Sequence, residues 1–135
     1  MTERERLSLD EVRNEMDGTG RSLRDFLDRR PGESGATLAL ERLETTFMLR
    51  LYATFEGLLR ARIGPSVGVS EGLTNLVQRL AGEGSTHDPA TAAEMPWWEL
   101  FRRDRNPLMH GRTNPPALSM NITISQMQIF LTQFP

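Results

Sequence analysis

Apolar residues recur at intervals of three and four along most of the chain, which is the spacing of an amphipathic helix. The longest run extends from about residue 36 to residue 63. It consists of Leu40, Leu43, Phe47, Leu51, Phe55, Leu58 and Leu59. Gly64 and Pro65 follow directly and predict its end. Gly57 lies four residues from both Ala53 and Ala61. Such a row of small side chains predicts close packing against another helix.

Shorter helical patterns precede this run. A short helix is predicted around Leu9, Val12 and Met16, and the glycines at positions 18 and 20 predict its end. A second amphipathic piece covers residues 21–30. The spacing leaves open whether these two pieces form one helix.

The second half of the chain continues in the same way. Ser70 predicts the N-cap of a helix that ends at Gly82, and a further helix is predicted over residues 96–111. Apolar and polar residues alternate over residues 118–124, which predicts a strand or an extended segment. Ser125 predicts the cap of a last helix. The expected fold is therefore an all-α bundle of four to five helices with a short extended segment near residues 118–124.

Composition narrows the class of protein. The chain has 135 residues, 38% of them hydrophobic and 25% charged, which fits a single globular domain over residues 1–135. It has no Cys, which excludes disulfides, and its only histidines are His87 and His110, so a His/Cys zinc site is not expected, nor is any other metal or cofactor. No apolar run is long enough to span a membrane and no signal peptide begins the chain, which predicts a cytoplasmic protein. The abrupt end at Phe134-Pro135 leaves open whether the chain is a fragment of a longer protein.

The charge is concentrated locally. The formal net charge is −2, and every one of the 16 cationic side chains is arginine. The segment 100–112 contains Arg102, Arg103, Arg105 and Arg112 against one acid, Asp104, so its local charge is +3. Arginine binds phosphate in a bidentate manner and cannot act as an amine base.

One segment combines groups suited to catalysis. Trp98, Phe101, Arg105 and Leu108 follow a helical stripe in which Arg105 takes the place of an apolar residue. Asn106 and His110 are four residues apart and lie on the adjoining strip, and Pro107 between them predicts a kink. An imidazole that moves a proton and a guanidinium that stabilises a phosphate suffice for metal-free RNA cleavage by the ribose 2′-OH.

At these residues, Arg105-Asn106-Pro107-Leu108-Met109-His110-Gly111, the chain resembles the HEPN superfamily, whose members include ribonuclease toxins and phage-defence effectors. The resemblance implies a metal-independent endoribonuclease that cleaves single-stranded RNA. His110 would be the general base or acid, Arg105 the phosphate stabiliser and Asn106 the polar residue that supports them. The segment Tyr52-Ala53-Thr54-Phe55-Glu56 is similar to the family's central helix, and Glu56 is a candidate supporting residue.

The resemblance also implies partners. Family members usually work as homodimers in which two motifs form one cleft, and RNA and an antitoxin or another protein are the expected partners. In one toxin branch a tyrosine two residues after the histidine is modified. This chain has Arg112 there and its only tyrosine is Tyr52, so nucleotidylation at the motif is not expected.

Each of these residues also has a simpler interpretation. Arg105 could form a structural ion pair with Glu56 or Glu44, and His110 could be a cation favoured by the C-terminus of its helix. Arg102, Arg103 and Arg112 form either a track for RNA phosphates or an exposed face. Trp97 and Trp98 suit base stacking or packing. The alternatives to a nuclease are a non-catalytic HEPN-like dimerisation or nucleotide-binding module, and a helical protein-interaction subunit that does not contact nucleic acid.

Overall fold

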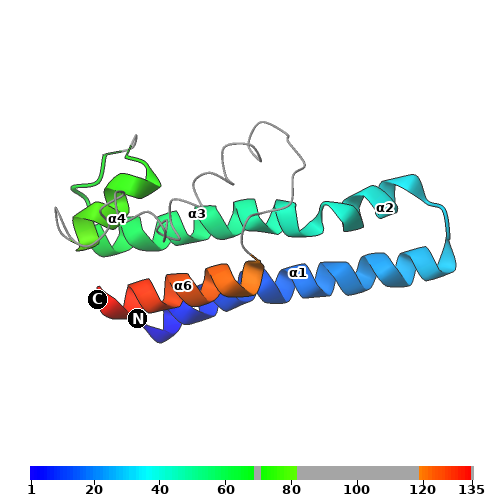
Figure 1. Cartoon of the computed structure of the whole chain (residues 1–135), viewed down its shortest axis with the longest axis horizontal. Helices are drawn as coiled ribbons and strands as arrows, with labels where there is room; N and C mark the ends of the chain where they lie inside the picture. Colours follow the sequence, from blue (N-terminus) through cyan, green and yellow to red (C-terminus); the bar gives the residue numbers. More distant parts are fainter. Residues whose placement is uncertain (69–70, 82–118, 135) are drawn as a thin grey trace, which may run out of the picture.

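The computed structural model describes residues 1–68, 71–81 and 119–134, and helix is the only regular secondary structure among them. In chain order the helices are α1 (Glu3–Arg29), α2 (Ser34–Glu41), α3 (Leu43–Ile63), α4 (Leu73–Ala81) and α6 (Met120–Gln133). α2 and α3 run back along α1, and α6 lies against the first half of α1, with both chain termini at the same end (Figure 1). The predicted all-α class is confirmed.

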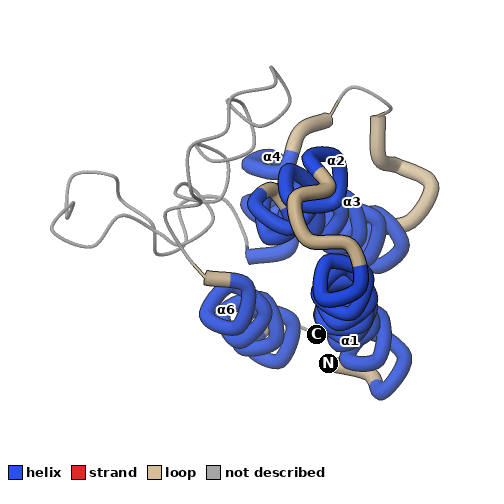
Figure 2. The backbone as a smooth tube through the Cα atoms, turned by 90° about the vertical axis from the view of Figure 1, so that its right-hand side faces the viewer, coloured by secondary structure: helices blue, strands red, loops and turns tan. Residues whose placement is uncertain are grey.

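The core lies where α1, α3 and α6 meet in a triangle, with α4 packed on α3 (Figure 2). The rings of Phe55 and Phe130 meet edge to face at its centre, with centroids 6.1 Å apart. The buried apolar side chains are Leu9, Val12, Met48, Leu51, Tyr52, Phe55, Leu59, Leu73, Leu76, Val77, Met120, Ile124, Met127, Phe130 and Leu131.

α1 continues through both glycines, so the end predicted at positions 18–20 is wrong and the two predicted pieces are one helix. The reason is packing. Gly20 is buried, and a Cβ atom added there would lie only 3.0 Å from Leu43 Cδ2. The glycine therefore allows α1 to approach the start of α3, and this contact offsets the intrinsic cost of about 1 kcal/mol for glycine in a helix.

The long helix predicted over residues 36–63 is divided in two. α2 begins earlier, at Ser34, and Arg42 separates it from α3 with φ −97° and ψ 5°. The predicted end is correct, because Gly64 follows Ile63 with φ +90°, a conformation that side-chain-bearing residues rarely adopt.

The strand or extended segment predicted near residues 118–124 is wrong for residues 120–124, because α6 begins at Met120. Ser119, and not Ser125, is the N-cap: its Oγ accepts a hydrogen bond of 3.3 Å from the Ile122 amide. Alternation would bury Ile122 and expose Thr123, but Ile122 is 52% exposed and Thr123 is fully buried. The Thr123 hydroxyl donates to the Ser119 carbonyl at 2.8 Å, which satisfies this polar group inside the core.

The row of small residues on α3 does not pack against a described helix. Ala53, Gly57 and Ala61 are exposed, and a Cβ atom at Gly57 would meet no atom within 4 Å. The core lies on the opposite side of α3. Among the residues for which the structure is described, this row therefore serves no helix contact.

α4 is joined to α3 by a short segment held by arginines. The guanidinium of Arg60 donates to the carbonyls of Gly68 (3.0 Å) and Glu71 (2.5 Å), and Arg79 pairs with the Glu71 carboxylate at 2.7 Å. The predicted cap Ser70 and the predicted helix over residues 96–111 lie outside the described residues. None of the described helices is long and apolar enough to cross a membrane.

Candidate functional site

The residues of the predicted catalytic motif lie outside the described part of the chain. This holds for Arg105, Asn106 and His110, and for the predicted phosphate track of Arg102, Arg103 and Arg112. Their roles stay predictions. The supporting candidate Glu56 is described: it is half-buried on α3, directly after the core residue Phe55.

Glu44, one of the acids considered as a partner for Arg105, has a structural role. It lies in the first turn of α3, and its Oε1 accepts a hydrogen bond of 3.2 Å from the amide of Met120, the first residue of α6. Helix N-termini leave such amides without partners within the helix. Glu44 and Ser119 together therefore cap α6 and fix where it begins against α3.

The opposite end of α6 is held by a buried ion pair. Arg62, in the last turn of α3, binds Glu5 in a bidentate manner through Nε (2.5 Å) and Nη2 (2.7 Å), with side chains only 13% and 9% exposed. The same guanidinium donates to the carbonyls of Leu131 (2.9 Å) and Phe134. It thus joins the start of α1, the end of α3 and the end of α6.

Glu5 has a second role in this cluster. It forms a capping box with Thr2: the Thr2 amide donates to Glu5 Oε1 at 2.8 Å, and the Glu5 amide donates to Thr2 Oγ1 at 3.1 Å. The hydrogen bonds from Arg62 lower the pKa of Glu5 to about 2, although burial acts in the opposite direction. Glu5 is therefore a fixed structural anion at neutral pH.

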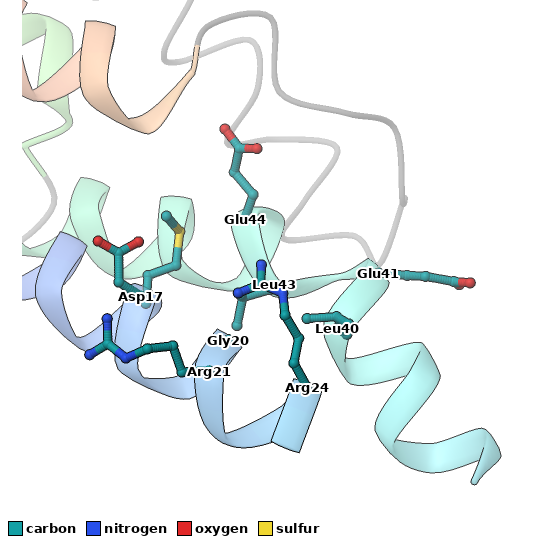
Figure 3. Close-up of a pocket in the computed structure, with 9 residues that line it drawn as sticks. Asp17, Gly20, Arg21, Arg24, Leu40, Glu41, Leu43 and Glu44 are labelled. Atoms are coloured by element: carbon teal, nitrogen blue, oxygen red, sulfur yellow. The ribbon is translucent and has the colours of Figure 1, made fainter. Parts of the chain in front are cut away.

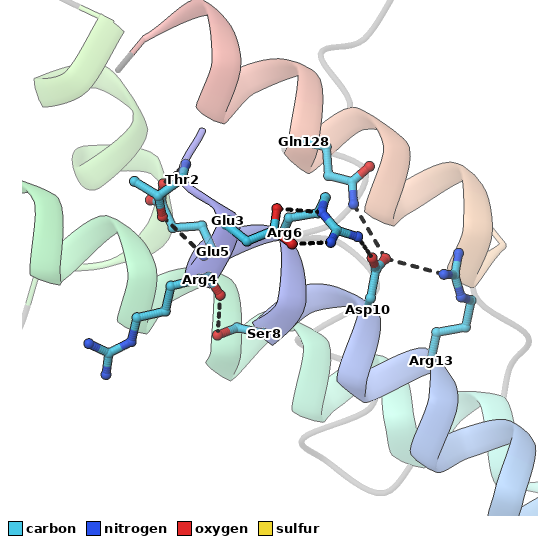
Figure 4. A network of polar contacts seen from close by, with 9 residues as sticks. All are labelled: Thr2, Glu3, Arg4, Glu5, Arg6, Ser8, Asp10, Arg13 and Gln128. Atoms are coloured by element: carbon cyan, nitrogen blue, oxygen red, sulfur yellow. Dashed lines mark hydrogen bonds and ion pairs between the residues drawn. The ribbon is translucent and has the colours of Figure 1, made fainter.

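Asp10 anchors the middle of α6 to α1 (Figure 4). Its carboxylate accepts from Arg6 (3.0 Å) and Arg13 (3.2 Å) on its own helix and from Gln128 Nε2 (3.4 Å) on α6. Gln128 belongs to a helix without any charged residue. Asp10 thus forms a polar contact between the two helices, to which α1 contributes the charged groups and α6 contributes the side-chain amide of Gln128.

Beyond the N-terminus of α6 lies an open groove between α1 and the α2–α3 junction, with a volume of about 470 Å³ (Figure 3). We call it the arm groove, after the second half of α1 and α2 (residues 21–41), beside which it lies. Its least exposed lining residues are the buried Gly20 and the half-buried Met16, Leu40 and Leu43. These small and apolar residues form its floor.

The rim of the arm groove is charged and exposed. α1 contributes Asp17, Arg21 and Arg24, and the opposite side contributes Glu41 and Glu44. The guanidinium of Arg24 lies over the floor, with Nη1 3.4 Å from the position that a Cβ atom would take at Gly20. One wall therefore has a net charge of +1 and the other of −2, counting one charge for each side chain.

Comparison with known proteins does not assign the chain to a family. No protein-family model matches the chain, and no curated protein or solved structure matches it. Among the described residues, no group of three or more His, Asp or Glu side chains is placed to hold a metal ion.

The sequence offered only indirect signals for the sites that the structure describes. The Glu5–Arg62 pair joins residues 57 positions apart, a separation that no periodic pattern encodes. The glycine at position 20 suggested a helix end and in fact marks the floor of the arm groove. Its place within the apolar spacing of Leu9, Val12 and Met16 was the signal that could have indicated a buried contact.

Proposed function

We propose that the chain is a metal-independent endoribonuclease of the HEPN type that cleaves single-stranded RNA, acting as a toxin or phage-defence effector. The observation that carries this proposal is the spacing of Arg105, Asn106 and His110 within a segment of local charge +3. The helical bundle is compatible with it, since the family is all-helical. A polyanionic substrate also suits a segment rich in arginine.

In the proposed reaction, the ribose 2′-oxygen attacks the adjacent 3′-phosphorus. His110 accepts the proton of the 2′-hydroxyl, a new O2′–P bond forms, and the P–O5′ bond breaks. An imidazolium returns a proton to the leaving 5′-oxygen, so the products are a 2′,3′-cyclic phosphate and a 5′-hydroxyl. Arg105 neutralises the charge that grows on the phosphoryl oxygens, and Asn106 orients the imidazole or donates to the phosphate.

Further parts of the proposal follow the family pattern. Arg102, Arg103 and Arg112 would bind flanking phosphates, and Glu56 would support the motif from α3. A cytoplasmic homodimer would bring two motifs to one RNA strand, and an antitoxin or another protein would restrain it.

The proposal is tested with purified protein and a labelled single-stranded RNA. We expect cleavage that EDTA does not diminish, with 2′,3′-cyclic phosphate ends, and its loss by more than about 100-fold in His110→Ala and Arg105→Ala, because each removes a group used in the transition state. His87→Ala and Arg4→Ala are matched controls that should keep full activity. Circular dichroism verifies that all variants fold.

Three results would contradict the proposal. Cleavage that persists in His110→Ala would remove the imidazole from the mechanism, and loss of cleavage on chelation would indicate a metal. RNA binding without shortening, unchanged in His110→Ala, would favour the non-catalytic HEPN-like binding module.

A further inference from the structure

The arm groove continues the surface on which α6 lies. Asp10, which holds α6 through Gln128, is followed at helical spacings of seven, four and three by Asp17, Arg21 and Arg24, so these residues share one face of α1. At the other side of the groove, Glu44 both caps α6 and lines the groove. The groove therefore lies next to the N-terminus of α6.

Several charged groups of the rim have no partner among the described residues. Arg21, Arg24 and Glu41 are exposed and take part in none of the ion pairs or side-chain hydrogen bonds among the described residues. Elsewhere on α1 comparable side chains are paired, as Arg6 and Arg13 are with Asp10.

We infer that the arm groove binds an amphipathic helix of a partner protein, with an acidic flank against Arg21 and Arg24 and a basic flank against Glu41 and Glu44. The argument rests on shape and on charge. α6 shows that the adjoining surface of α1 and α3 receives a helix, and the floor of Met16, Gly20, Leu40 and Leu43 offers an apolar bed with a glycine at its base. The opposite signs of the two walls select a ligand with opposite charges on its two flanks.

The dimensions of the groove set the length of the ligand. Its α1 side runs from Met16 to Arg24, which corresponds to about 12 Å of helix, or two to three turns. A segment of this length places three or four apolar side chains on the floor. An interface of this size is small, so binding should be weak and should depend strongly on the flanking charges.

The test uses three synthetic helical peptides with identical leucines at helical spacing. One has Glu along one flank and Arg along the other, the second has Glu on both flanks and the third has Arg on both. In one of its two directions along the groove, the peptide with mixed flanks places each flank against the wall of opposite charge, whereas each of the other two peptides faces a wall of like charge in both directions. Fluorescence anisotropy with the full chain should show that it binds at least about tenfold more tightly than the other two.

Variants of the chain assign the binding to the groove. In the double variant Arg21→Glu/Arg24→Glu both walls are acidic, so the peptide with Arg on both flanks should become the tightest ligand. The matched control Arg29→Glu/Arg30→Glu makes the same change of charge on arginines that do not line the groove and should keep the original order. Equal binding of all three peptides, no binding, or the same change of order in the control would overturn the inference. Neither variant alters the proposed nuclease motif, so RNA cleavage is an independent measurement.

Discussion

The two halves of α1 are similar in sequence pattern and differ in burial. In the first half, Leu9 and Val12 are buried in the core, and Glu5 is held by Arg62. In the second half and in α2, which together we call the arm (residues 21–41), no described apolar side chain is fully buried. Phe26 is 40% exposed and Leu38 is 44% exposed.

The difference follows from the number of described helices that meet at each end. At one end, which we call the packed end, α1, α3, α4 and α6 surround one core. The arm consists of two described helices, because α6 begins only at Met120 and lies against the first half of α1 (Figure 1). Two helices bury one stripe of each other and leave the remainder exposed. The comparison shows that helical periodicity predicts the element, whereas a third layer decides burial.

Truncating a phenylalanine at each end should give the largest contrast. Phe55→Ala removes a fully buried ring and should lower the free energy of unfolding by about 4 kcal/mol. Phe26→Ala should cost less than about 1 kcal/mol, since its ring is already partly in solvent. Urea unfolding followed by circular dichroism measures both. Equal losses would mean that the arm is part of the core.

The next effect concerns two Arg–Glu pairs that both join α1 to α3. Arg62→Met removes the cation that pairs with the buried Glu5 carboxylate and that donates to two carbonyls at the end of α6, so the free energy of unfolding should fall by about 3 kcal/mol. Arg50→Met removes the ion pair with Glu15, in which the Arg50 side chain is 51% exposed and the Glu15 side chain is 36% exposed. This substitution should lower the free energy of unfolding by less than about 1 kcal/mol. A smaller loss for Arg62→Met than for Arg50→Met would show that the junction of the three helices is not what stabilises the packed end.

Acid should weaken the packed end through Glu5. Its folded pKa, about 2, lies below the ordinary value of 4.5, so its contribution is fully present above about pH 4.5 and is lost as the pH falls towards 2. The difference in free energy of unfolding between the native chain and Glu5→Gln should therefore shrink over that range. Urea titrations at pH 5 and at about pH 2.5 measure it. A difference that stays constant with pH would assign the native pKa of Glu5 to its ordinary range.

The helices themselves were largely predictable. The stripe of α3 and its end at Gly64 follow from local spacing and from the conformational freedom of one glycine. The strand prediction was wrong because the apolar residues within 118–124 fit both the alternation of a strand and the spacing of a helix. Only the longer run through Met120, Ile124, Met127 and Leu131, with the cap at Ser119, distinguishes a helix from a strand.

The polar contacts that position α6 could not be predicted, because they are tertiary. Glu44 and Arg62 lie at opposite ends of α3 and bind opposite ends of α6 only once the bundle has formed. The arm groove is likewise a product of where α6 begins. The proposed catalytic motif, in contrast, rests on local spacing alone and lies outside the described residues, so it stays a prediction.

The smallest predicted effect compares two glycines within helices. Gly57→Ala on α3 adds a methyl group into open space, so it should raise the free energy of unfolding by about 0.5–1 kcal/mol through the better helix propensity of alanine. Gly20→Ala gains the same propensity, but its Cβ atom would lie 3.0 Å from Leu43 Cδ2 and would force α1 or the leucine to move. The stability of Gly20→Ala should therefore be lower than that of Gly57→Ala, as measured by urea unfolding. Equal gains would show that α1 and α3 do not need a glycine where the arm leaves the core.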